Sequence, residues 1–60
     1  MNVKALRKQR KLNQTMLAKR IGVTQAYIAM LEKGDNVNPT LSLLTKLARA
    51  LKVPVAQLVE

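Results

Sequence analysis

Basic side chains are the residues of this sequence best placed to do chemistry, because they gather in one half of the chain. The first 31 residues contain no Asp or Glu. They carry seven of the eleven cations, namely Lys4, Arg7, Lys8, Arg10, Lys11, Lys19 and Arg20. This asymmetry, within a net charge of +8, favours a polyanionic partner, either nucleic acid or an acidic membrane surface. The alternative is a solvated basic surface that only promotes solubility.

Residues for catalysis and metal binding are scarce. The chain of 60 residues has no Cys and no His, which excludes disulfides, zinc fingers, haem attachment and triads built on either residue. Its only serine is Ser42, and its three carboxylates are Glu32, Asp35 and Glu60. Few acid–base pairs remain possible. We therefore expect a binding protein that is not an enzyme and needs no cofactor and no metal ion.

Composition indicates one small domain over residues 1–60. Tyr27 is the only aromatic residue, which argues against modules that stack RNA or single-stranded bases on aromatic rings. The longest uncharged run, residues 21–31, falls well short of the about 18 residues of a membrane span, and no signal peptide is visible. We therefore predict a cytoplasmic protein. A membrane-active basic helix is disfavoured, because the glycines and charges build a turn and not one long amphipathic face.

Apolar residues recur at helical spacing, which predicts an all-α domain without strands. The predicted helices span about residues 2–10, 14–21, 25–33, 41–51 and 54–59. Asn13, Thr24 and Thr40 are the expected N-caps, and Gly22 and Gly34 follow two helices at positions that suit a left-handed backbone. The first helix presents Val3, Leu6 and Arg10 at helical spacing, the fourth carries an apolar stripe from Leu41 to Leu51, and Pro54 is the expected first residue of the fifth.

The second and third helices, joined by residues 22–24, have the features of a helix-turn-helix. Ala18 supplies the small residue where two helices cross, and Gly22 supplies the positive φ of the turn. The wedge between the helices would be filled by Leu17, Ile21, Val23, Ile28 and Leu31. The alternative is an αα-hairpin of a small bundle with no contact to DNA.

The chain resembles the Cro/phage-repressor class of helix-turn-helix proteins, also called the Xre family. The resemblance is carried by Leu12-Asn13-Gln14-x-x-Leu17-Ala18-x-x-x-Gly22-x-Thr24-Gln25-x-x-Ile28-x-x-Leu31-Glu32-x-Gly34, by Pro39-Thr40-Leu41 and by Leu47-Ala48-x-Ala50-Leu51-x-Val53. It implies a compact, lambda-repressor-like five-helix domain whose third helix, about residues 25–33, enters the major groove. The implied function is sequence-specific regulation of transcription on double-stranded DNA, as a repressor encoded by a bacterium or phage and associated with the nucleoid.

Arg7 is expected to be partly buried in the first helix, beside Leu6. A buried guanidinium needs a carboxylate, because an unpaired interior charge is very costly. Of the three acids, Glu60 is terminal and Asp35 lies in a loop, so elimination predicts a structural ion pair between Arg7 and Glu32. The family resemblance implies the same pair.

Base readout is expected from the outward face of the third helix. Gln25 can pair with adenine through two hydrogen bonds, and the resemblance implies a base-contacting residue there. Its alternative is an ordinary exposed residue at a helix N-terminus. Ala26, Ala29 and Met30 are less polar than is common in the family, and their apolar surface can touch thymine methyl groups.

Contacts to the DNA backbone are expected near helix N-termini and in the loop before the fourth helix. The predicted contacts are Gln14, Thr24, Tyr27, Lys33, Asn36, Asn38 and Thr40. Tyr27 has two equal interpretations, a hydroxyl on a phosphate or a ring packed on the scaffold. The loop carries Asp35, which repels phosphate, in place of the cation often found in the family.

A homodimer on a palindromic operator is expected, because one recognition helix reads only a few base pairs. The apolar residues proposed for the dimer contact are Val37, Val55, Leu58 and Val59. The alternative function is a protein-interaction module of the same fold, such as an antitoxin that binds a toxin or a coregulator. Lys11 and Lys52 stand where the family often has a helix-ending glycine, which costs about 1 kcal/mol each if the backbone is left-handed.

Overall fold

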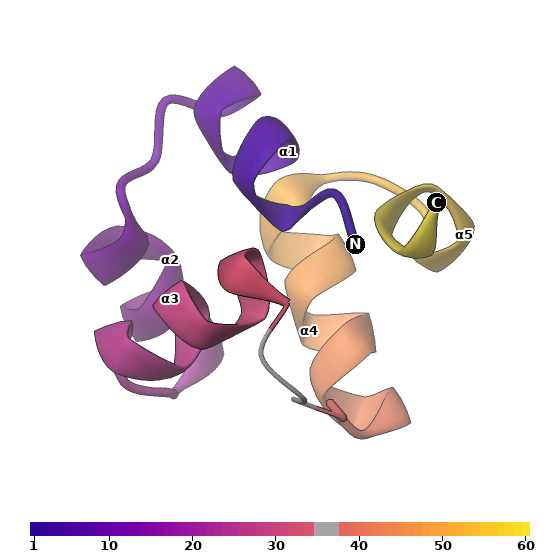
Figure 1. Cartoon of the computed structure of the whole chain (residues 1–60). Coiled ribbons are helices and arrows are strands. Elements are labelled where there is room, and N and C mark those ends of the chain that lie inside the picture. The colour runs from indigo at the N-terminus through magenta and orange to yellow at the C-terminus, as the bar shows by residue number, and fades with distance from the viewer. Residues whose placement is uncertain (35–37) are drawn as a thin grey trace.

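The computed structural model describes residues 1–34 and 38–60. Within these residues the apolar periodicity produces five helices joined by short connections (Figure 1). They are α1 (Val3–Gln9), α2 (Gln14–Ile21), α3 (Gln25–Lys33), α4 (Leu41–Leu51) and α5 (Val55–Val59). The all-α prediction is confirmed, and the predicted boundaries agree to within a residue. Pro54 is the N-cap of α5 and not its first helical residue, because its ψ of 153° is still extended.

Local signals begin and end these helices as the sequence predicts. The side-chain oxygens of Asn13, Thr24 and Thr40 each accept a hydrogen bond from the backbone N–H three residues later, at 2.7, 3.1 and 3.1 Å. Each cap satisfies a donor that the first helical turn leaves unpaired. Gly22 ends α2 with φ of +78°, so the chain can turn sharply into α3 without the steric cost that a Cβ would add.

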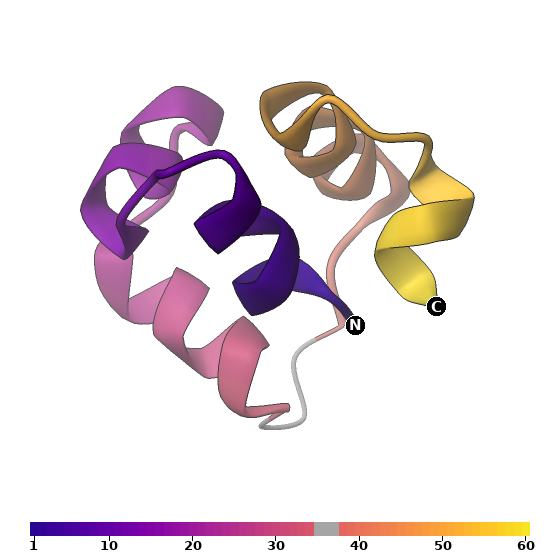
Figure 2. The ribbon, with the colours of Figure 1, turned by 90° about the horizontal axis from the view of Figure 1, so that it is seen from above.

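The core lies where the five described helices meet. Its largest fully buried side chains are Val3, Leu17, Ile28, Leu47, Leu51 and Leu58, which come from every one of these helices. Helix α2 packs against α3 and α4, and α4 packs against α5. Figures 1 and 2 both show α2 and α3 side by side, with α5 on the other side of α4. The chain ends lie close together, because the Asn2 N–H donates to the Leu58 carbonyl at 2.9 Å.

Two positions correct the predictions from periodicity. Leu58, predicted as a dimer contact, has no exposed surface, because it lies on the side of the short helix α5 that faces the core. Leu41, predicted to extend the buried stripe of α4, is 74% exposed, because it begins the helix one turn before Leu44, which packs against the core. Of the other predicted dimer contacts, Val55 is half-buried and Val59 is exposed, whereas Val37 lies outside the described residues.

Candidate nucleic-acid interface

Helices α2 and α3 form the predicted helix-turn-helix, and burial determines which side of α3 faces outward. Ile28 and Leu31 are buried in the core, and Val23 in the turn packs against it. Because an α-helix turns about 100° per residue, the opposite side of α3 presents a separate set of side chains. These are Gln25, Ala26, Ala29, Met30 and Lys33, which are exposed except for the half-buried Ala29.

The predicted ion pair between Arg7 and Glu32 is present and joins α1 to α3. Nε of Arg7 lies 2.7 Å from Oε2 of Glu32, and Nη2 donates to Oε1 at 3.1 Å. The third nitrogen, Nη1, donates to the Leu12 carbonyl at 2.9 Å, which fixes the segment between α1 and α2. The side chains of Arg7 and Glu32 are only 10% and 5% exposed, so the pair is well shielded from water. A bidentate pair of this kind imposes both distance and orientation.

The ion pair perturbs both partners. For Glu32, burial would raise the pKa, but hydrogen bonds from Arg7 and Gln14, together with the positive charges of Arg7 and Lys4, outweigh it and lower the pKa below the ordinary glutamate value. The hydrogen bond to Glu32 raises the pKa of Arg7, although burial opposes the change. Glu32 is therefore ionised at neutral pH and acts only as a hydrogen-bond acceptor.

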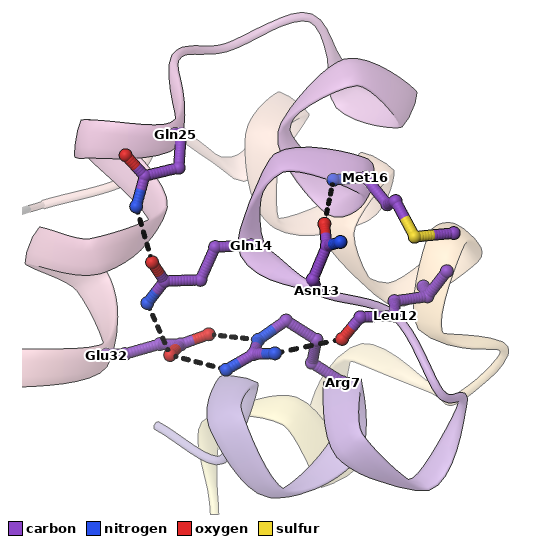
Figure 3. A network of polar contacts seen from close by, with 7 residues as sticks. All are labelled: Arg7, Leu12, Asn13, Gln14, Met16, Gln25 and Glu32. Carbon is purple, nitrogen blue, oxygen red and sulfur yellow. Dashed lines mark hydrogen bonds and ion pairs between the residues drawn. The ribbon is translucent and has the colours of Figure 1, made fainter.

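Gln14 connects this ion pair to the outward face of α3, an arrangement that the sequence predictions missed. Its Nε2 donates to Oε1 of Glu32 at 3.0 Å, and its Oε1 accepts a hydrogen bond from Nε2 of Gln25 (Figure 3). The available signal was the spacing of two glutamines that each begin a helix, at positions 14 and 25. Gln14 is half-buried, and its side chain lies between α2 and α3 and not in open solvent.

The chemistry of the three groups determines how the amides are oriented. An ionised carboxylate accepts hydrogen bonds and donates none, so Gln14 must turn its NH₂ group toward Glu32. Its carbonyl oxygen is then left for Gln25, which must respond with an N–H. The bond to Gln14 uses one of the two amide protons of Gln25. Its Oε1 and second amide proton form the acceptor–donor pair that matches N6 and N7 of adenine.

The predicted backbone contacts divide into several environments. Thr24 and Thr40 are exposed, and their hydroxyl oxygens cap α3 and α4, which leaves each hydroxyl proton to donate elsewhere. Lys33 and Asn38 are exposed, and Asn36 lies outside the described residues. Tyr27 is half-buried with its side chain packed against the core, which supports its scaffold interpretation. Thr24 and Lys33 lie at opposite ends of α3, and Asn38 and Thr40 lie just before α4.

Arg10 shares helical spacing with Val3 and Leu6, but it lies outside this interface and, unlike them, is exposed. It follows α1, is exposed, and donates from Nε to the Leu51 carbonyl at 2.9 Å and from Nη2 to the Lys52 carbonyl at 3.3 Å. Its guanidinium therefore satisfies two carbonyls at the end of α4.

The described residues form neither a candidate metal site nor a membrane-spanning helix. Within residues 1–34 and 38–60, no cluster of three potential metal ligands occurs. None of the described helices has both the length and the apolar character to cross a membrane.

Comparison with known proteins gives one family and several relatives. A family model described as helix-turn-helix matches residues 3–58. The immunity repressor protein of Bacillus phage phi105 is 42% identical over 57 residues, which cover 95% of this chain and 39% of that protein. The HTH-type transcriptional repressor RghR of Bacillus subtilis is 42% identical over 52 residues, which cover 87% of this chain and 38% of that protein.

A third relative is an uncharacterized HTH-type transcriptional regulator of Coxiella burnetii, 36% identical over 58 residues. The match covers 97% of this chain and 27% of that protein. The chain thus spans between 27% and 39% of the length of these three relatives. Their similarity to this chain lies in the helical domain described above.

Proposed function

The chain belongs to the helix-turn-helix family, in its Cro/phage-repressor class, and from this premise we propose that it is a sequence-specific transcriptional repressor that binds double-stranded DNA. Helix α3 enters the major groove with Gln25 at its leading end. The observation that carries the proposal is the hydrogen bond from Gln25 to Gln14, which holds a bidentate amide at the outward start of α3. The names of two relatives, an immunity repressor and a transcriptional repressor, support repression over activation.

Charge supports the same function. The acid-free first 31 residues include α1, α2 and most of α3, so the helix-turn-helix lies in the basic half of the chain. Their cations attract the phosphate backbone over a distance, and the exposed N-termini of α2 and α3 offer N–H groups to individual phosphates. Thr24 and Lys33 supply backbone contacts at the two ends of α3, with Asn38 and Thr40 beside it. The proposed place of action is the bacterial cytoplasm, where the DNA lies.

The first test is selection from random duplexes, followed by equilibrium binding of the wild type and Gln25→Ala at two salt concentrations. We expect a defined sequence, and we expect Gln25→Ala to relax one adenine-containing position by about 1–3 kcal/mol. Gln57→Ala is the matched control, because Gln57 is exposed on α5, away from α3. Binding that shows no preferred sequence and is lost equally in the wild type and both variants as salt rises would falsify the proposal. The partner would then be sought among proteins, such as a toxin.

A homodimer completes the proposal, because two recognition helices read two half-sites about 10 base pairs apart. Val59, at 51% exposure, is the described residue of α5 that supports a contact there, whereas the half-buried Val55 also packs against the core. Val59→Glu is expected to lower affinity for the palindrome while leaving binding of a single half-site unchanged. Leu41→Glu is the comparison variant for sedimentation without DNA, since Leu41 is exposed on α4. If only Leu41→Glu separates the protomers in sedimentation, the contact lies on α4 and the proposed one on α5 is wrong.

A further inference from the structure

The outward face of α3 is apolar between Gln25 at its start and Lys33 at its end. Ala26 lies at the centre of this face, opposite the buried Ile28 and Leu31, with Ala29 and Met30 on either side. Met30 is 45% exposed, which is a large exposed area for an apolar side chain in a helix with a well-packed inner face. We call Ala26, Ala29 and Met30 the apolar face of α3.

Hydrogen-bonded readout by α3 is limited to its two ends. Gln25 supplies one acceptor and one donor beyond its bond to Gln14, which is enough for a single adenine. Lys33, in the last turn, carries a flexible ammonium group. The apolar face between them has no hydroxyl, amide or carboxylate, and the thioether of Met30 is only a weak acceptor. One amide is too little to specify an operator.

The major groove offers one apolar feature to such a face, the C5-methyl group of thymine, which projects from the base edge. We propose that Ala26, Ala29 and Met30 read the positions of pyrimidine C5-methyl groups, so that the protein selects a pattern of thymines beside the adenine contacted by Gln25. This inference rests on the proposed function, because it requires α3 to lie in the major groove of duplex DNA.

Side-chain size supports this assignment. Alanine has only a methyl group, so Ala26 and Ala29 allow the helix axis to approach the bases closely, and their Cβ atoms can contact thymine methyls directly. Met30 is unbranched, flexible and polarizable, and it can reach a methyl group farther along the groove. Each methyl buried against this face should change affinity by about fourfold, the value expected for burying one such group.

The test replaces the thymines of the selected duplex by uracil, one at a time. Uracil keeps every hydrogen bond of thymine and lacks only the methyl group. We expect about fourfold weaker binding at two or more positions beside the adenine read by Gln25, and recovery with 5-bromouracil, whose bromine is close to a methyl group in size. Thymines in the flanking sequence serve as controls and should tolerate uracil without loss.

Protein variants assign the effect to the apolar face. Met30→Gln keeps the length of the side chain, and Ala26→Ser nearly keeps its volume; both positions are exposed on α3. Each variant should bring the ratio of the affinities for the thymine and uracil duplexes toward one at one position. Lys33→Gln should weaken binding to all duplexes and keep that ratio. Helicity of each variant is checked by circular dichroism. Sequence-specific binding that is indifferent to uracil at every position overturns this inference alone, whereas the lack of any preferred duplex overturns the proposed function with it.

Discussion

Nε2 of Gln14 lies 3.0 Å from Oε1 of Glu32, so a single amide joins the buried ion pair to the outward start of α3. On one side of that amide, Arg7 and Glu32 hold α1 against α3. On the other side, Gln14 accepts the hydrogen bond that orients Gln25. The order of these contacts separates the stability of the fold from the readout of bases. Changes at Glu32 should affect both folding and readout, whereas changes at Gln14 should mainly affect readout.

Gln14→Leu tests the orientation of Gln25. Leucine keeps the helix propensity of glutamine but is one bond shorter and has no amide, so Gln25 loses the bond that fixes its side chain. We expect adenine discrimination at the Gln25 position to fall by about 1 kcal/mol, or about fivefold, as is typical of one hydrogen bond. Equilibrium binding to the selected duplex and its single-base variants measures this change.

The control for Gln14→Leu is Thr15→Leu, which adds the same side chain at the next, exposed position of α2. Thr15→Leu should leave the discrimination intact. If Gln14→Leu also retains full adenine discrimination, then Gln25 does not depend on Gln14 for its orientation.

Glu32→Gln tests the contribution of the ion pair to stability. The substitution keeps the shape of the side chain but leaves the guanidinium of Arg7, only 10% exposed, without its counter-charge. Breaking a buried pair from one side costs about 3 kcal/mol or more, a large part of the total for so small a domain. Urea unfolding at pH 7, followed by circular dichroism, measures the change. Glu60→Gln, at the exposed last residue, should cost less than about 0.5 kcal/mol, and an equal effect of the two variants contradicts the prediction.

The lowered pKa of Glu32 predicts how stability depends on pH. Because the folded chain holds the ionised carboxylate more strongly than the unfolded chain, this stabilisation is fully present above the ordinary value of 4.5. It is lost as pH falls through the lower pKa of the folded state. The unfolding free energies of wild type and Glu32→Gln should therefore differ at pH 7 and converge in acid. Both proteins keep Asp35 and Glu60, so the difference isolates Glu32, and a difference that stays constant down to pH 2 refutes this account.

Arg10 stabilises the end of α4 from a distant part of the sequence. Its two hydrogen bonds to the carbonyls of Leu51 and Lys52 also bring a positive charge to the negative end of the helix dipole. We expect Arg10→Ala to lower the free energy of unfolding by about 1 kcal/mol, a modest value because the side chain is exposed. Arg10→Lys should recover only part of this, because lysine keeps the charge but lacks the planar fork. Full recovery with lysine would show that charge alone matters.

The features that could be predicted from the sequence are those determined by near neighbours or by scarcity. The caps at Asn13 and Thr24 depend on a few adjacent residues, and the partner of Arg7 could be inferred because the chain has only three carboxylates. The bond between Gln14 and Gln25 depends on how closely two helices approach, which periodicity does not specify.

Helical spacing alone misplaced Leu41 and Leu58, for two different reasons. Helical spacing shows which residues share a face, but it does not show where along the helix that face is covered by neighbours. Leu41 lies on the correct stripe of α4, but beyond the core, whereas Leu58 lies on a helix too short for its pattern to be read. The contacts to bases and phosphates depend also on the DNA, so neither helical spacing nor burial determines them.

Lys52 offers the sharpest test of backbone strain in the described residues. It ends α4 with φ of +58°, which is a left-handed conformation. The family resemblance implies that a glycine often stands at this position. Lys52→Gly should relieve about 1 kcal/mol of steric strain in the folded state. Glycine also makes the unfolded chain more flexible, which offsets part of this gain, so we expect a small net increase in the free energy of unfolding. The carbonyl of residue 52 is retained and still accepts the hydrogen bond from Arg10. Lys46→Gly is the matched control, because it makes the same exchange at an exposed position inside α4 and should destabilise by about 1 kcal/mol. Opposite signs for the two variants in thermal unfolding support the strain at Lys52, and a loss of stability in both shows that the left-handed lysine costs little.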